Sequence, residues 1–247
     1  MTATSPPDHG QASRGGGPLD ALTGLRALDL SDGIAGAYCA KLFADAGAEV
    51  VKIEPPSGHP LRQWSTSGSV GCDGDPDGAL FRHLAAGQRS TVATLNDPAG
   101  RDHVLDLVAV SDVVIESFPP RYLDERGLGA RDLHGANTAL TVVSITPFGQ
   151  QGPRHAERRS EFLLQALVGS LQLHGGVDGP PVAVGGQLGE WAAGAYAAAG
   201  ALAARARTVS TGVGEQVDVS VFEALAVTFL AYPTLFAALP GGTRSQT

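Results

Sequence analysis

Short apolar runs alternate with helix-like segments along the first 145 residues of this 247-residue chain, and no other feature constrains its fold as strongly. Residues 26–30 (RALDL) form one such run, residues 49–53 (EVVKI) form the next, and a helix is expected between them. Gly47 marks the end of that helix, because glycine is common just past a helix C-terminus. A strand, a helix and a strand within fewer than thirty residues predict a right-handed βαβ crossover and therefore a parallel sheet.

The same pattern recurs further along the chain. Additional strands are expected at residues 90–94, 113–115 and 140–145. Asn96 or Asp97 is positioned to N-cap a helix that begins at Pro98, since proline is favoured as the first helical residue. This alternation predicts an α/β fold with a Rossmann-like, open, mostly parallel sheet flanked by helices, which binds ligands at the carboxyl ends of its strands.

The second half of the chain changes character. It is expected to contain a helix, a long alanine-rich helix, a last strand and a last helix, at residues 160–171, 190–206, 216–220 and 221–239. Small side chains along the alanine-rich helix would let another backbone approach it closely. We expect a disordered tail at residues 1–18, one α/β domain at 19–239, and the start of a linker or a flexible C-terminus at 240–247.

The charge balance excludes some classes of function. Seventeen basic and twenty-five acidic residues give a net charge of −8, which excludes a broad nucleic-acid-binding surface. Residues 1–18 lack the apolar core of a signal peptide, and no run reaches the roughly 18 consecutive apolar residues of a membrane span. Two cysteines, Cys39 and Cys72, are too few for a disulfide scaffold or a cysteine-based zinc site. A cytoplasmic protein without nucleic-acid or membrane partners is therefore expected.

A series of short segments, each weak alone, becomes specific through its order and spacing. The segments are 25–30 (LRALDL), 47–54 (GAEVVKIE), 127–129 (GLG), 143–145 (VSI) with 148–149 (FG), 165–166 (QA) and 217–220 (VDVS). Through them the chain, from about Leu22 to about Leu225, resembles the N-terminal part of the family III CoA-transferases. That group includes formyl-CoA transferase, carnitine CoA-transferase and α-methylacyl-CoA racemase.

The resemblance implies an enzyme that moves coenzyme A from an acyl-CoA to a carboxylic acid. Its nucleophile would be a carboxylate, an aspartate near the start of the helix that carries Gln165, and Glu161 stands at that position here. Glutamate is one methylene longer than aspartate, so its oxygens would lie at a different position relative to the thioester. Without the resemblance, helix capping alone explains these residues: Ser160 can N-cap the helix, and an acid in the first turn stabilises the helix dipole.

Coenzyme A carries a 3′-phosphate and a pyrophosphate, and fifteen of the seventeen basic residues are arginine, which suits bidentate phosphate binding. The resemblance implies that the nucleotide lies beside the loop after the first strand and the loop after residues 113–115. The expected contacts are Asp32, Gly33, Ile34, Ala35, Ser117 and Phe118, with Arg89 as the first phosphate candidate and Arg121 or Arg126 next. Some family contacts are not kept: a basic residue often found after the 49–54 strand is Pro55 here.

Family members are substantially longer than this chain, and the resemblance implies that a homodimer or a partner chain supplies the C-terminal part. An acyl-CoA and a small carboxylic acid are the expected substrates, with no tightly bound cofactor. Two other functions fit the same residues. One is a catalytically silent half that binds CoA or dimerises, in which Glu161 only caps a helix. The other is an acyl-CoA racemase or dehydratase of the same fold.

Overall fold

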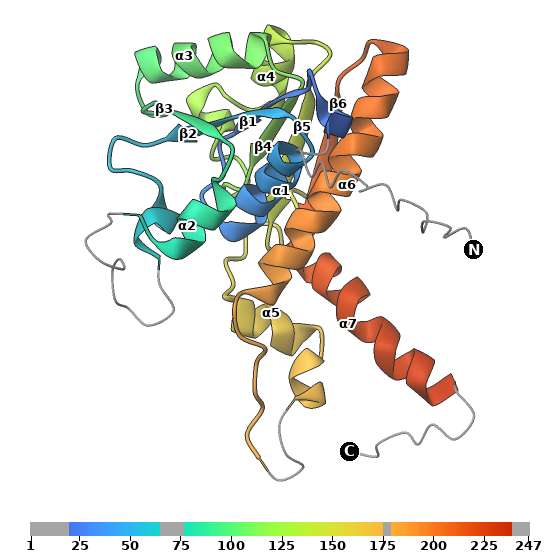
Figure 1. Ribbon diagram of the computed structural model, residues 1–247. Helices are drawn as coiled ribbons and strands as arrows, with labels where there is room; N and C mark the ends of the chain where they lie inside the picture. The colour runs from blue at the N-terminus through green and yellow to red at the C-terminus, as the bar shows by residue number, and fades with distance from the viewer. Residues whose placement is uncertain (1–19, 65–76, 175–178, 239–247) are drawn as a thin grey trace, which may run out of the picture.

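Six parallel strands form a central sheet in the computed structural model, which describes residues 20–64, 77–174 and 179–238 (Figure 1). Their order across the sheet is β3-β2-β1-β4-β5-β6, so the predicted Rossmann-like α/β fold is confirmed. Their bounds are Arg26–Asp29 for β1, Glu49–Glu54 for β2, Arg89–Val92 for β3, Val113–Glu116 for β4, Thr141–Thr146 for β5 and Glu215–Ser220 for β6. The predicted tail at 1–18, the predicted end at 240–247 and Cys72 lie outside the described residues.

Helices cover both faces of this sheet. α1 (Ile34–Asp45) and α6 (Leu188–Thr211) pack on one face, whereas α3 (Pro98–Ala109) and α4 (Ala130–Ala136) pack on the other (Figure 1). Successive side chains of a strand enter opposite cores: Ala27 faces α1 and α6, and Leu28 faces α3 and α4. Burial on both faces explains why the strands read as nearly continuous apolar runs.

Shorter elements join the layers, and several of them were not predicted from the sequence. α2 (Ala79–Leu84) packs beside α1, and α4 precedes β5. Single 3₁₀ turns lie at Asp20–Leu22 (η1), Pro60–Gln63 (η2), Asp124–Arg126 (η3) and Ser170–Leu173 (η4). Within the described ranges, no helix is long and apolar enough to cross a membrane.

Local sequence signals account for the helix ends and for one close helix contact. The Asp97 side chain accepts a hydrogen bond from the Gly100 N–H at 2.6 Å, so the predicted N-cap of α3 is confirmed. Gly47, just past α1, has a positive φ of 96°, as expected of a helix-ending glycine. At Gly194 a Cβ would lie 2.5 Å from the carbonyl oxygen of Ala35, so the missing side chain lets α6 touch α1.

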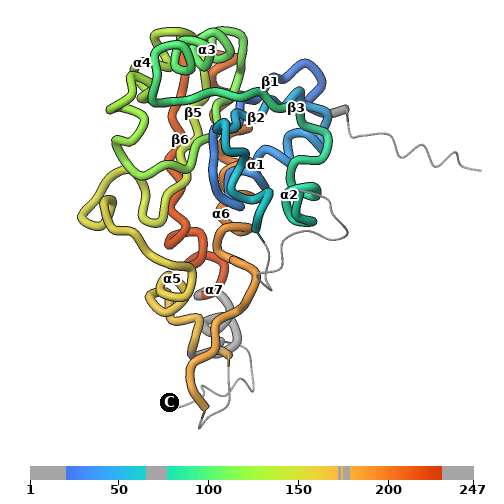
Figure 2. Tube along the Cα trace, turned by 90° about the vertical axis from the view of Figure 1, so that its left-hand side faces the viewer, coloured from blue at the N-terminus to red at the C-terminus, as the bar shows by residue number. Residues whose placement is uncertain are grey.

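The chain after β5 departs from the prediction. The helix expected at 160–171 is interrupted, because α5 spans only Glu161–Leu167 and Gly169 adopts a φ of 76° before η4. α6 is longer than expected and ends at Thr211, with Gly212 as its C-cap, while α7 spans Val221–Ala238. Figures 1 and 2 show α5 and α7 projecting from one end of the sheet, away from α3 and α4.

Candidate active site

A cavity of about 290 Å³, which we call the main cavity, lies at the carboxyl edge of the sheet. This is the edge where ligands bind in open α/β sheets, next to the point between β1 and β4 where the strand order reverses. The loops after β1 and β4, the end of β5 and the starts of α5 and α6 form its walls. Its lining includes Asp32, Gly33, Ala35, Ser117, Pro119, Thr146, Arg158, Arg159, Glu161, Leu164 and Glu190.

Two donors hold one oxygen of the Glu161 carboxylate. Oε1 accepts hydrogen bonds from the Gly189 N–H at 2.7 Å and from Gln165 Nε2 at 2.9 Å. Gln165 is fully buried and is itself held by the backbone of Val184, to which it donates and from which it accepts. Oε2 is shielded from water and has no hydrogen-bond partner among the described residues. One oxygen is therefore anchored, and the other keeps its lone pairs unshared.

The start of α5 differs from the cap expected of it. Ser160 occupies the N-cap position, but its side chain makes no capping hydrogen bond. The anchored oxygen of Glu161 is bound across the cavity wall by the start of α6 and by Gln165, one turn along α5. Capping alone therefore does not account for the position of this carboxylate.

A second carboxylate, Glu190, shares the main cavity with Glu161. Its Oε2 accepts hydrogen bonds from the N–H groups of Ile34 (2.8 Å) and Ala35 (3.1 Å), at the N-terminus of α1. The residue at the N-cap of α1 is Gly33, which has no side chain to do this, so Glu190 serves as a remote cap. Burial raises the pKa of Glu190 above its usual value, and the charge of Glu161 adds to the effect.

A neighbouring cavity of about 260 Å³, the aromatic cavity, lies on the other side of Asp32. Asp32 lines both cavities, and its carboxylate accepts a hydrogen bond from Ser117 Oγ at 2.9 Å. Phe118 and Tyr122 line the aromatic cavity and stack with their ring centroids 4.6 Å apart. The Arg126 guanidinium lies 3.5 Å from the centroid of the Tyr122 ring. Flat apolar walls beside a guanidinium suit a purine that carries phosphate.

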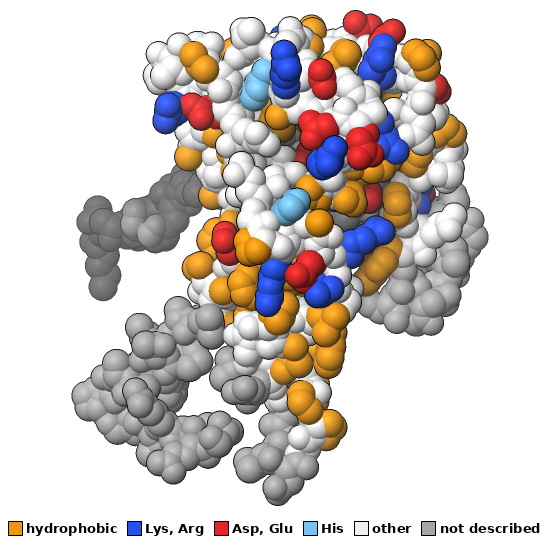
Figure 3. Space-filling view, turned by 180° about the vertical axis from the view of Figure 1, so that it is seen from behind, with side chains coloured by type: hydrophobic (Ala, Val, Ile, Leu, Met, Phe, Trp, Pro, Cys, Tyr) orange, Lys and Arg blue, Asp and Glu red, His pale blue; other side chains and the backbone are white. Residues whose placement is uncertain are grey.

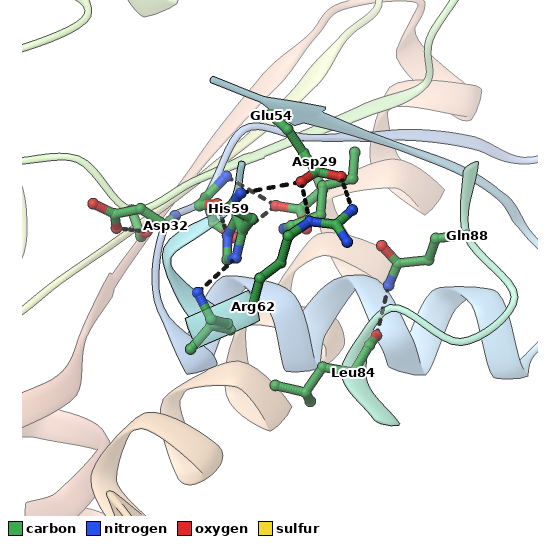
Figure 4. Close-up of polar contacts among 11 residues, drawn as sticks. Asp29, Asp32, Glu54, His59, Arg62, Leu84 and Gln88 are labelled. Atoms are coloured by element: carbon green, nitrogen blue, oxygen red, sulfur yellow. Dashed lines mark hydrogen bonds and ion pairs between the residues drawn. The ribbon is translucent and has the colours of Figure 1, made fainter. Parts of the chain in front are cut away.

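Buried ionic contacts support the loops around the aromatic cavity (Figure 4). Asp29 and Lys52, both almost completely buried, form an ion pair of 2.5 Å. Arg62 binds Glu54 with two hydrogen bonds of 2.7 Å each. These bonds lower the pKa of Glu54 to about 2, so Glu54 is ionised at neutral pH. His59 lies among these groups and is 2% exposed.

Glu116, the last residue of β4, is buried beside a third cavity of about 400 Å³. Its Oε2 accepts a hydrogen bond from the Phe118 N–H at 2.8 Å, and Arg121 lines the same cavity. Burial raises the pKa of Glu116 to about 7. In the part of the chain that the structure describes, no group of three or more His, Cys, Asp or Glu side chains is arranged to hold a metal ion.

Comparison with known proteins decides the family. The family model described as CoA-transferase family III matches residues 22–246, which is most of the chain. The chain belongs to this family.

Curated proteins of related sequence carry names that agree with this membership. Succinyl-CoA–D-citramalate CoA-transferase of Chloroflexus aurantiacus is 35% identical over 207 residues, which cover 83% of this chain and 50% of that protein. The subunit BbsE of succinyl-CoA:(R)-benzylsuccinate CoA-transferase from Thauera aromatica is 36% identical over 207 residues, with 82% and 49% covered. This family III chain thus spans about half the length of the curated relatives it matches.

A solved structure supports the fold of this family III chain. A crystal structure of a CAIB/BAIF family protein from Brucella suis superposes with a TM-score of 0.81 at 31% sequence identity. The match covers 89% of this chain and 58% of the other.

Most residues predicted as CoA contacts meet at the carboxyl edge of the family III sheet. Asp32, Gly33, Ala35 and Ser117 line the main cavity, and the N–H of Ile34 points at Glu190. Phe118 lines the aromatic cavity, Arg126 a cavity of about 490 Å³ next to Asn96, and Arg121 the cavity beside Glu116.

Arg89 does not lie with the other predicted contacts. It is the first residue of β3, and it pairs at 3.2 Å with Glu49, the first residue of β2. The amino ends of parallel strands lie on the edge of the sheet opposite to their carboxyl ends. Arg89 lines neither the main cavity nor the aromatic cavity. Arg89, the first phosphate candidate from the sequence, is therefore separated in this structure from the loops after β1 and β4.

Sequence reasoning missed four residues of the site: Gln165 as an anchor of Glu161, Gly189, Glu190 and His59. Glu190 starts the predicted alanine-rich helix, a position that signals a helix N-terminus but not contact with a different helix. Gln165 belongs to the 165–166 segment of the resemblance, which does not show that its side chain binds Glu161, and Gly189 belongs to no motif. His59 lies in a Gly/Pro-rich turn, where a buried histidine is not expected.

Proposed function

We propose that this chain is the part of a CoA-transferase that holds the CoA nucleotide and carries the nucleophile, Glu161. The observation that carries the proposal is the Glu161 carboxylate in the wall of the main cavity, with one oxygen anchored and the other unpartnered among the described residues. Family III membership supports the general reaction, which is transfer of CoA between carboxylic acids. The names of the relatives, which include succinyl-CoA transferases, support an acyl-CoA donor.

The proposed reaction begins with attack of Glu161 Oε2 on the thioester carbonyl carbon. The C–S bond breaks and its electron pair leaves with the CoA thiolate, so Glu161 and the acyl group form a mixed anhydride. The thiolate then attacks the Glu161 carbonyl carbon, which releases the first acid as a carboxylate and leaves a glutamyl-CoA thioester. The acceptor carboxylate repeats both steps in reverse order and leaves as the new acyl-CoA. A carboxylate suits this role because it is ionised at neutral pH without a general base.

The geometry adds a requirement to the first step. Because water does not reach Oε2 in this structure, the Glu161 side chain has to turn toward the main cavity before it meets the thioester. Gly189 and Gln165 hold the carboxylate until then.

The linings of the two cavities suggest one orientation for coenzyme A. We place the adenine in the aromatic cavity against Phe118 and Tyr122, with Arg126 toward the phosphates. The pantetheine arm would pass Asp32 and Ser117 into the main cavity, where its sulfur would meet Glu161. Arg158 and Arg159 line the main cavity and would attract the acceptor acid.

The complete protein is proposed to include a partner chain or a further part of the same chain. The relatives are about twice as long as the matched region. On α5, the large apolar side chains of Phe162, Leu163 and Leu167 are 51%, 46% and 44% exposed. Figure 3 shows hydrophobic side chains gathered over the projecting lower part of the molecule, where α5 lies. Additional polypeptide would cover this surface.

The test is chemical trapping of the acyl group on Glu161. The protein, as its gene encodes it, is incubated with succinyl-CoA and then with hydroxylamine, and its peptides are analysed by mass spectrometry. A hydroxamate on Glu161 is expected, and Glu161→Gln should form none although it still binds CoA, because an amide does not form the anhydride. Unchanged transfer by Glu161→Gln contradicts the proposal.

One observation favours a second candidate function. Oε2 of Glu161 is packed away from water, an arrangement that also fits a catalytically silent half that only holds CoA beside a partner. The same experiment separates the two functions. CoA binding with no hydroxamate on Glu161, at any time of incubation, identifies the silent half.

A further inference from the structure

The Ser31–Asp32 segment, which follows β1, forms the wall between the aromatic cavity and the main cavity. Ser31 lines the aromatic cavity, and Asp32 lines both. On one side this segment is held by Asp29, whose Oδ1 accepts hydrogen bonds from Ser31 N–H (2.9 Å) and Ser31 Oγ (2.6 Å). These bonds fix the N–H and hydroxyl of Ser31, and its carbonyl group needs another partner.

His59 supplies that partner from a different element. Its Nε2 lies 2.9 Å from the carbonyl oxygen of Ser31, which only accepts hydrogen bonds, so Nε2 carries the proton. The other ring nitrogen, Nδ1, accepts the N–H of Leu61 at 3.2 Å and caps η2. Both nitrogens are therefore used, one as donor and one as acceptor, and only the neutral Nε2–H tautomer satisfies both contacts.

Burial of the ring favours the same neutral state. Burial lowers the pKa of His59 below its usual value, and the charge of Lys52 on β2 lowers it further. Asp29 on β1 and Glu54 on β2 act in the opposite direction, but Glu54 is already paired with Arg62 of η2. A charged ring would also point a second N–H at the N–H of Leu61.

Hydrogen bonds also hold the backbone of His59 and the residues beside it. The His59 N–H donates to Glu54 Oε2 at 3.1 Å, and Arg62 bridges Glu54 and Asp77. Figure 4 shows His59 among Asp29, Glu54 and Arg62. The ring is thus a rigid link between η2 and the loop after β1.

We propose that His59 is a positioning residue for coenzyme A: through its bond to the Ser31 carbonyl it sets the wall of the aromatic cavity. The inference rests on the proposed function, because it requires the CoA nucleotide in that cavity. His59 also lines the aromatic cavity itself, beside Ser31, and it positions Ser31 and Asp32 through its bond to the Ser31 carbonyl. It takes no part in the chemistry at Glu161. Its loss should therefore weaken CoA binding and leave the rate at saturating substrate nearly unchanged.

Two variants separate this role from simple capping of η2. The amide of glutamine reaches as far as Nε2, so His59→Gln keeps a donor for Ser31 and loses the cap on Leu61. The amide of asparagine reaches only as far as Nδ1, so His59→Asn keeps the cap and loses the donor. His59→Phe keeps the ring and its contact with Phe81 but removes both hydrogen bonds.

The measurement is the Kd for CoA by titration calorimetry, with thermal unfolding of each variant and, where transfer is active, KM and kcat. His59→Asn and His59→Phe should weaken CoA binding about tenfold, the effect of one buried hydrogen bond, and His59→Gln should stay near the wild type. Equal affinities in the Asn and Gln variants overturn the inference, and so does the reverse order, which would mean that only the cap on η2 matters. If His59→Phe does not fold, the comparison of Asn with Gln still decides. Wild-type protein that binds no CoA contradicts the proposed function itself.

Discussion

Gly189 donates its N–H to Glu161 Oε1 at 2.7 Å, and a Cβ on the same residue would lie 2.7 Å from Glu161 Oε2. The glycine therefore both anchors the carboxylate and leaves room for it. A side chain one methylene longer than the aspartate of the family pattern needs that room. Gly189 and Glu161 thus fit one another in size.

Substituting alanine at this glycine should destabilise the protein through overpacking. Gly189→Ala is expected to lower the unfolding free energy, because the clash costs about 1–3 kcal/mol. The higher helix propensity of alanine offsets at most ~1 kcal/mol of this cost. The cost should be smaller when combined with Glu161→Asp, because the shorter carboxylate retreats from the added methyl group. Urea unfolding of the two single variants and the double variant measures the coupling.

The outcome that contradicts this fit is an equal cost of Gly189→Ala in both backgrounds. A Cβ at residue 189 would also lie 2.8 Å from Leu225 Cδ1, and that contact does not depend on residue 161. Equal costs would therefore assign the clash to Leu225 alone.

Glu190 is predicted to stabilise α1 from a distance. Glu190→Ala leaves the N–H groups of Ile34 and Ala35 without their acceptor and should cost about 1–2 kcal/mol of unfolding free energy, as for loss of an N-cap. Glu190→Gln keeps an acceptor oxygen and should cost less. Urea unfolding at pH 7 is the measurement, with Glu157→Ala as a control because Glu157 pairs with Arg159 and caps no helix. Equal costs for the Ala and Gln variants would mean that the cap is unimportant.

The two arginines considered for phosphate binding should behave differently. Arg126→Ala is expected to weaken the binding of CoA about tenfold or more while weakening dephospho-CoA less, because a charge-assisted hydrogen bond to the 3′-phosphate is lost. Arg89→Ala should leave both affinities unchanged, since Arg89 pairs with Glu49 at the opposite edge. Calorimetric titration with both nucleotides is the test. A loss of affinity in Arg89→Ala would place the phosphate elsewhere.

Glu116 should make the stability fall as the pH rises. Its pKa is raised from 4.5 to about 7 by burial, so the folded protein holds a proton that the unfolded chain has already released. The contribution is fully present below pH 4.5 and is lost as the pH rises through about 7, a total change of about 3 kcal/mol. Glu116→Gln does not titrate and should lose less stability between pH 5 and pH 8. Urea unfolding of the wild type and of Glu116→Gln across this pH range tests the prediction. Parallel pH profiles of the two unfolding free energies would contradict it.

Features that depend on nearby residues were predictable from the sequence. The N-cap at Asp97 and the helix end at Gly47 each involve residues within one helical turn. Glu161 was identified through the resemblance to the family, because it lies at the family's carboxylate position, four residues before Gln165. The alternation of strands and helices predicted a parallel sheet, whereas the order of its strands came from the structure.

Features that depend on strand register and on distant contacts were not predictable from the sequence. Arg89 stands just before the strand expected at 90–94, but the sequence does not show that this strand pairs with β2 or that Arg89 meets Glu49. Ser160 fits an N-cap by sequence, yet its side chain makes no cap bond.

By itself, the sequence determined a parallel α/β sheet with a carboxylate at the start of α5, because backbone geometry and short-range spacing decide such elements. Only the tertiary structure decided that Gly189 anchors this carboxylate, that Glu190 caps α1, and that His59 holds the Ser31 carbonyl. The first and third pairs are 28 residues apart along the chain, and Glu190 is 156 residues from Ile34. The partners in each pair meet only after the strands have assembled. The physical reason is that a hydrogen bond across such distances forms only when the packing of the whole sheet has already brought its partners together.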